Sequence, residues 1–190
     1  MAKKPQLKED EWAFVPIGDP FPENPVRGYQ STNAYVALWY KHGKPTCGRA
    51  WNNGGVVECS FPFNKAELTG KRDLGGNIQI LTYKGEFKDN NFHYVWIPYN
   101  KRFQEQYQLV RCGQIVPCCM QNAKGDFLLG EIDMQTETAR CSYDGKAETV
   151  VGPKVQEMLI IVRDTIPPQD YIPLSADSPN IWTDVRAGDE

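Results

Sequence analysis

The sequence of 190 residues has few histidines, no long apolar run and no excess of positive charge. Only His42 and His93 could serve as the base that hydrolases and transferases place beside a nucleophile, and no local motif surrounds either of them. The formal net charge of −3 excludes the bulk positive field that holds proteins on nucleic acid or anionic membranes. No apolar stretch approaches the roughly 20 residues of a spanning helix. We therefore expect no enzyme, no nucleic-acid partner and no membrane insertion.

The N-terminus carries lysines but no apolar segment after them, which predicts that there is no secretion signal. Without such a signal, the six cysteines are expected to be free thiols in a reducing cytosol. The closest of them, Cys112, Cys118 and Cys119, lack the Cys-x-x-Cys spacing of zinc sites. The glycine-rich segment 73–79 lacks the Lys-Ser/Thr of a phosphate-binding loop. We expect a cytoplasmic protein without metal or cofactor.

Two stretches of the sequence repeat each other, "CSFPFNKAELTG" from Cys59 and "CSYDGKAETVVG" from Cys141, 82 positions later. The same offset aligns further pairs upstream, among them Pro16 with Pro98, Gly48 with Gly130, and Ser60 with Ser142. One residue is lost after Phe63, so the two Lys-Ala-Glu elements align at an offset of 81. A shared register of this length indicates an internal duplication.

The duplication predicts two units, 12–85 and 94–166, each too short to bury a face well alone and therefore packed on each other as one pseudo-symmetric body. A flexible N-terminal segment, 1–11, precedes them, and a Pro/Asp-rich tail, 167–190, follows. Within that tail, "DYIPL" at 170–174 resembles the opening of each unit and is expected to take the strand position of a next copy.

Short β-branched or aromatic runs bounded by Gly, Pro, Asn or Asp predict strands. They lie at 34–40, 55–61, 77–83, 93–99, 106–112, 127–132 and 157–162. "HGK", "WNNGG", "AKGD" and "YDGK" have the chemistry of hairpin turns. Helical periodicity is scarce. We predict an all-β or strand-dominated fold with few short helical turns, one of them near Lys65–Thr69.

Each unit has Lys-Ala-Glu after a turn, with the two charges on the same side of an extended strand. One interpretation is a repeated ion pair or turn lock. The other is that the charged loops form two binding patches, so that one molecule holds two partners. The candidate partner-binding residues are Lys65, Glu67, Lys146, Glu148 and Arg49, the last of which is not repeated because Glu131 aligns with it.

The segment from Asn24 to Gly70, with "YQLVRCG" and "SYDGKAE" further on, resembles the major sperm protein fibre protein two family, cytosolic motility proteins of nematode sperm. The resemblance spans roughly residues 12–165. It implies a β-rich, repeated, non-enzymatic protein of the sperm pseudopod cytoskeleton. Its implied partners are filaments of major sperm protein, whose assembly or bundling it promotes, and other fibre proteins.

"GRAW", the glycine-rich turn after it and the Lys-Ala-Glu element are also similar to the lectin-like repeats of natterin-type proteins. Those repeats bind sugars, notably mannose, so a carbohydrate-binding module is the alternative. A cytosolic protein with free thiols suits an intracellular filament partner better than an exported lectin.

Overall fold

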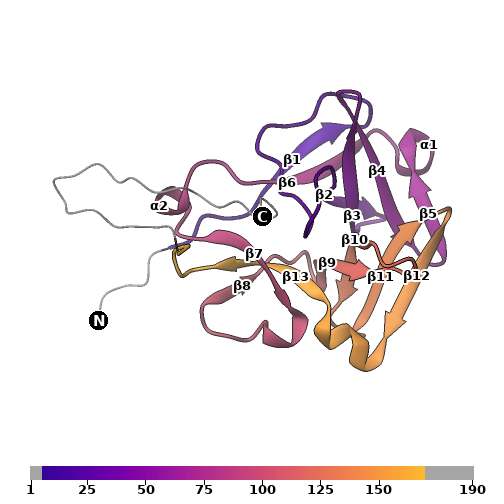
Figure 1. Cartoon of the computed structure of the whole chain (residues 1–190). Coiled ribbons are helices and arrows are strands. Elements are labelled where there is room, and N and C mark those ends of the chain that lie inside the picture. Colours follow the sequence, from indigo (N-terminus) through magenta and orange to yellow (C-terminus); the bar gives the residue numbers. More distant parts are fainter. Residues whose placement is uncertain (1–5, 170–190) are drawn as a thin grey trace.

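The computed structural model describes residues 6–169 and confirms a strand-dominated fold with a few short helices (Figure 1). The strands are β1 Glu11–Pro16, β2 Tyr35–Lys41, β3 Lys44–Asn53, β4 Val56–Phe63, β5 Ala66–Thr69, β6 Asn77–Thr82, β7 His93–Pro98, β8 Tyr107–Leu109, β9 Ile115–Gln121, β10 Phe127–Asp133, β11 Thr138–Tyr143, β12 Lys146–Val151 and β13 Leu159–Asp164. The helices are α1 Gly70–Leu74, α2 Phe87–Asn90 and the 3₁₀ turns η1 Tyr99–Lys101 and η2 Gly152–Glu157.

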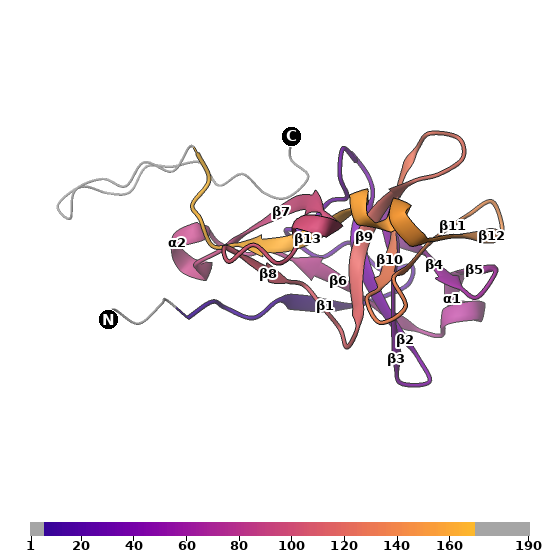
Figure 2. The same cartoon turned by 90° about the horizontal axis from the view of Figure 1, so that it is seen from below.

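Hydrogen bonds join the strands into one sheet, in the order β1-β6-β2-β3-β4-β5-β12-β11-β10-β9-β13-β7, with β8 paired to β13 beside this path. The sheet folds back on itself, so that β2, β3 and β4 lie above β10, β11 and β12 in Figure 1, and Figure 2 shows the same body from below. The midpoint of the path is the contact of β5 with β12, where Lys146 is opposite Ala66. The first six strands of the path therefore meet the last six at this point.

From one end the path runs β1-β6-β2-β3-β4-β5, and from the other end it runs β7-β13-β9-β10-β11-β12. Each strand of the second series lies about 82 residues after the strand at the same place in the first. In the β1–β6 pair, Glu11 lies opposite Thr82, and in the β7–β13 pair His93 lies opposite Asp164. Each residue of the second pair is 82 positions after its counterpart in the first. The boundaries of the two units, 12–85 and 94–166, stay a prediction that this correspondence supports.

Three clusters of buried side chains form the core, one within each half of the path and one shared. Counterparts at the 82-residue spacing occupy the first two, for example Val15 and Ile97, Cys59 and Cys141, Phe61 and Tyr143, and Ile80 and Val162. The shared cluster combines side chains from both halves, such as Leu81 with Tyr94 and Leu129. Burial of this third apolar surface holds the halves together.

Close backbone approach explains why glycine recurs at Gly48 and Gly130. A Cβ on Gly48 would lie 2.2 Å from the carbonyl oxygen of Ser60, and one on Gly130 would lie 2.0 Å from that of Arg140. No side chain fits at such a distance without movement of the neighbouring strand.

Most of the predicted strands and turns are present, with differences at two places. The segment predicted as a helical turn near Lys65–Thr69 is wrong in position, because Ala66–Thr69 pairs with β4 as β5 and the helix α1 follows at Gly70. The strand predicted at 106–112 is reduced to Tyr107–Leu109. Turn chemistry is where it was predicted: His42, Gly54, Asp144 and Gly145 all have positive φ.

Residues 6–10 of the predicted flexible N-terminal segment bond to the body. The Lys8 amide donates to the Asn90 carbonyl, and the Tyr94 hydroxyl donates to the Asp10 carboxylate. The "DYIPL" fragment at 170–174 lies outside the described residues.

Candidate functional site

The two Lys-Ala-Glu elements, far apart in sequence, meet in space. The turn between β4 and β5 and the turn between β11 and β12 touch where Lys146 pairs with Ala66 (Figure 1). The Ala147 amide donates to the Lys65 carbonyl at 2.9 Å. We call this contact, formed by residues 63–67 and 143–148, the turn junction.

Local sequence explains both turns. Asp144 and Gly145 have φ of 53° and 80°, the positive values that two-residue hairpin turns require and that Asp and Gly tolerate. Asn64 supplies the positive φ of the other turn, at 52°. Each turn thus forms from its own residues, whereas their contact depends on how the two halves pack.

Glu67 lies at the centre of a bonded network that crosses the junction. Its carboxylate accepts hydrogen bonds from the Ser60 hydroxyl at 2.5 Å, the Gly145 amide at 3.0 Å and the Arg49 guanidinium at 3.5 Å. The side chains of Arg49 and Glu67 are 16% and 13% exposed. These two residues are therefore committed mainly to contacts inside the protein.

Arg49 also bridges the halves, because its guanidinium donates to the carbonyl of Ser142. Burial lowers the pKa of Arg49, and the attraction of the Glu67 carboxylate opposes that effect. The hydroxyls of Ser60 and Ser142, buried and 82 positions apart, lie 2.6 Å from each other. Because Ser60 gives its one hydrogen to Glu67, Ser142 is the donor between the two serines.

The lysines of the junction face solvent, unlike Arg49 and Glu67. Lys65 and Lys146 are exposed, whereas Glu148 is half-buried and accepts a hydrogen bond from the Tyr143 hydroxyl at 3.0 Å. In the described residues Glu67 is bonded to Arg49 and not to the lysine of its own tripeptide. The five predicted residues thus gather in one region, but only part of each tripeptide is accessible.

Glu131 stands 82 positions after Arg49 and is 5% exposed. It lies opposite Arg140 on the neighbouring strand β11. Burial raises the pKa of this carboxyl to about 8, while the charge of Arg140 lowers it and that of Asp133 raises it. Alignment of the two repeats within the sequence showed that Glu replaces Arg at this position, but not that the position is buried.

The six cysteines are free thiols, and burial raises the pKa of every one, to about 12 for Cys59, Cys119 and Cys141. A cysteine acts as nucleophile or metal ligand as the thiolate. Because burial favours the protonated form, none of these thiols is activated for covalent chemistry.

His93, on β7, is buried, and its Nε2 lies 3.0 Å from the Ile166 carbonyl and 3.6 Å from the Asp164 carboxylate.

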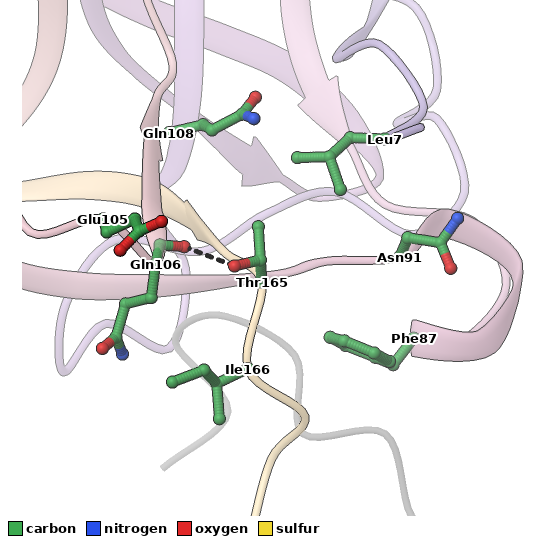
Figure 3. A pocket seen from close by; sticks show the side chains of 8 residues that line it. All are labelled: Leu7, Phe87, Asn91, Glu105, Gln106, Gln108, Thr165 and Ile166. Atoms are coloured by element: carbon green, nitrogen blue, oxygen red, sulfur yellow. Dashed lines mark hydrogen bonds between the residues drawn. The ribbon is translucent and has the colours of Figure 1, made fainter. Parts of the chain in front are cut away.

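A pocket of about 520 Å³ lies at the other end of the body, next to α2 and β8 (Figure 3). Its lining mixes amide, hydroxyl, carboxylate and apolar side chains: Leu7, Phe87, Asn91, Glu105, Gln106, Gln108, Thr165 and Ile166. The Thr165 hydroxyl donates to the Gln106 carbonyl at 2.8 Å. These residues come from four separate segments and share no motif, so the sequence carried no signal for the pocket.

Among residues 6–169, no helix combines the length and apolar character needed to cross a bilayer. Comparison with curated proteins found no match. A solved structure, the crystal structure of the nematode sperm cell motility protein MFP2B, is 49% identical, with a TM-score of 0.82. The match covers 92% of this chain and 50% of that one, so the chain spans half the length of this relative.

The family model MFP2b, described as cytosolic motility protein, matches residues 9–165. This range agrees closely with the predicted resemblance over 12–165, and the description confirms the expected cytosolic localisation and motility class. The chain belongs to the MFP2b family of cytosolic motility proteins.

Proposed function

We propose that this protein binds filaments of major sperm protein in the cytosol and promotes their assembly or bundling during amoeboid movement of sperm. The observation that carries the proposal is the likeness, at 49% identity and a TM-score of 0.82, to a nematode sperm cell motility protein. Family membership over 157 residues, from 9 to 165, supports the same class of role. Further fibre proteins are proposed as additional partners.

A role in assembly rather than catalysis agrees with the chemistry of the described residues. The thiols are protonated and mostly buried, and the hydroxyls of Ser60 and Ser142, just outside the turn junction, are enclosed between the halves. What the protein presents to a partner is a β-rich surface with exposed charges. A binding protein that acts by holding subunits near one another needs such a surface and no reactive group.

We propose Lys65, Lys146 and Glu148 as the charges nearest to the partner. Arg49 and Glu67 would position these charges without touching the partner, since their bonds to Ser142 and Gly145 hold the two turns in contact. Loss of either internal residue would then reduce binding by moving the lysines, whereas loss of a lysine would remove a contact and leave the fold unchanged.

The test is co-sedimentation with filaments of major sperm protein, together with the rate of fibre growth. K65E with K146E should weaken co-sedimentation and slow fibre growth, because each reversal places like charges at the contact. K84E with K154E changes two exposed lysines elsewhere and is the matched control. Failure of the wild-type protein to co-sediment with filaments or to alter fibre growth would refute the proposed function.

One observation favours the carbohydrate-binding alternative. The pocket in Figure 3 is lined by Asn91, Gln106 and Gln108 together with the aromatic ring of Phe87. Amides that bond hydroxyl groups and a ring that packs against a sugar face are the groups such a site needs. A glycan array distinguishes the two functions: binding of mannose-type glycans that N91A and F87A abolish would support the alternative.

A further inference from the structure

We propose that the turn junction is a single composite docking surface for an acidic protein, in place of two separate patches, one on each half. The inference rests on the proposed function in taking the filament as the natural partner, and it adds the chemistry of the contact and the number of sites.

The geometry brings the cations of both halves to one place. Ala66, the neighbour of Lys65, lies directly opposite Lys146, and the Ala147 amide bonds to the Lys65 carbonyl at 2.9 Å. Paired residues of adjacent antiparallel strands are about 5 Å apart. Two patches so close leave no room for two separate proteins, so both lysines contact the same partner.

Two further lysines extend the surface on each side. Lys41 Nζ lies 4.0 Å from the centre of the Phe63 ring, at the start of the first turn. In the second turn, Lys146 and Lys124 Nζ lie 5.4 Å and 6.0 Å from the centre of the Tyr143 ring. These cation–π contacts restrict the ammonium groups before a partner arrives, which lowers the entropy lost on binding.

The carboxylates near these lysines leave an excess of positive charge. Asp144 bonds to Lys124 at 2.6 Å, and Asp126 is a second exposed acid beside the same lysine. Glu67 and Glu148 are half-buried, and their carboxylates accept hydrogen bonds from Ser60 and Tyr143. Four lysines therefore face two exposed carboxylates, on a protein whose net charge is −3.

This balance favours an acidic protein surface over a lipid bilayer or a nucleic acid. Those polyanions repel the many exposed acids of a protein with negative net charge. A protein surface with a few carboxylates opposite the lysines, and apolar atoms opposite Phe63 and Tyr143, matches the charged and aromatic groups of the turn junction.

The experiment compares a junction variant, in which Lys41, Lys65, Lys124 and Lys146 are all changed to Gln, with a control in which Lys8, Lys84, Lys101 and Lys154 are changed to Gln. Both variants lose four exposed or half-buried lysines, so their net charges are equal. Glutamine removes the charge without adding repulsion, and circular dichroism checks that each variant is folded. The two probes are a fluorescent oligoglutamate peptide, measured by anisotropy at low and high salt, and filaments of major sperm protein, measured by co-sedimentation.

We expect the junction variant to bind oligoglutamate about tenfold more weakly than wild type at low salt, and the control within about twofold. Added salt should remove most of the difference, because exposed charges are screened. Equal weakening in both variants, or none in either, would overturn the inference.

Single variants test whether the surface is one site. K65Q and K146Q should each lower the affinity and leave the number of bound peptides per protein unchanged, whereas two independent patches would lose one site with each change. Filament binding separates the two proposals. If wild type binds oligoglutamate through the junction but does not co-sediment with filaments, the proposed function fails and the docking surface stands. If the wild type and the junction variant bind oligoglutamate equally and also co-sediment with filaments equally, the docking surface is refuted and the proposed function stands.

Discussion

Replacement of Glu131 by Gln should make the protein more stable at neutral and alkaline pH. The carboxyl of Glu131 is buried on β10, and Arg140 lies opposite it on β11. The Cys47 thiol of β3 is also near, since the charge of Glu131 contributes to the raised pKa of that thiol. Gln has nearly the same shape and cannot ionise. The substitution therefore isolates the cost of holding a carboxyl in this position.

The pKa of Glu131 is about 8 in the folded protein, against an ordinary value of 4.5 for the unfolded chain. Below pH 4.5 the group is protonated in both states and contributes no pH dependence. Between pH 4.5 and 8 the unfolded chain releases the proton while the folded protein keeps it, so the free energy of unfolding falls by about 1.4 kcal/mol per pH unit. Over the 3.5 units between the two values the loss amounts to about 5 kcal/mol, and it does not grow above pH 8.

Urea denaturation followed by tryptophan fluorescence at pH 5, 6, 7 and 8 measures this effect. The difference in free energy of unfolding between E131Q and wild type should be small at pH 5 and rise to several kcal/mol, on the order of 3 to 5, at pH 8. Taking the difference cancels the other titrating groups that both proteins share. E157Q, which removes a charge from an exposed position, controls for the change in net charge. Equal pH slopes for E131Q and wild type would show that Glu131 is not buried as a neutral acid.

Three other outcomes test the fold and the turn junction. G130A and G48A should each lower the free energy of unfolding, measured in urea, by at least about 2 kcal/mol, because the added Cβ would lie 2.0 or 2.2 Å from a backbone oxygen. G76A is the control and should lower it little, because the space around Gly76 is open. R49A should lower the free energy of unfolding by about 2 to 3 kcal/mol, because it leaves the Glu67 carboxylate without its cation, and R49A with E67Q should lower it less. If the double variant loses as much stability as the two single variants added together, the two residues are not coupled. Iodoacetamide at pH 7.5 should modify the native protein at Cys112, the half-buried thiol, and should reach the five buried thiols only after unfolding. Mass spectrometry identifies the alkylated residues, and alkylation of Cys47 or Cys118 in the native protein would contradict their burial.

The sequence by itself determined the elements whose causes are local. Asn-Gly and Asp-Gly chemistry located the turns at 51–55 and 143–146, and His-Gly located the turn at 42–44. Short β-branched and aromatic runs located most of the strands. The resemblance indicated the family and the cytosolic motility class, both of which the comparisons confirm. The recurrence of glycine at Gly48 and Gly130 was visible as a pattern before its reason, a backbone oxygen about 2 Å from any Cβ, was known.

Several strands escaped the sequence analysis for local reasons. β9 contains Pro117 in its middle and adjacent cysteines, a composition that does not indicate a strand until neighbours on both sides are known. β5 and β12 are short and carry charged residues, so nothing in their propensity separates them from turn. Their pairing partners, and not their own residues, make them strands.

Tertiary structure alone decided what the charged residues do. The two Lys-Ala-Glu elements are alike in sequence, yet Glu67 accepts hydrogen bonds from the Gly145 amide of the other half and from Arg49 of its own half, while Glu148 accepts one from Tyr143. The difference arises because the first half has Arg49 where the second has Glu131. Burial of Glu131 and exposure of Lys65 and Lys146 depend on which face each strand turns toward the other half. The contact of Glu67 with Gly145 joins residues 78 positions apart. The free energy that places such residues side by side comes from packing of the whole body, which no local stretch of sequence contains.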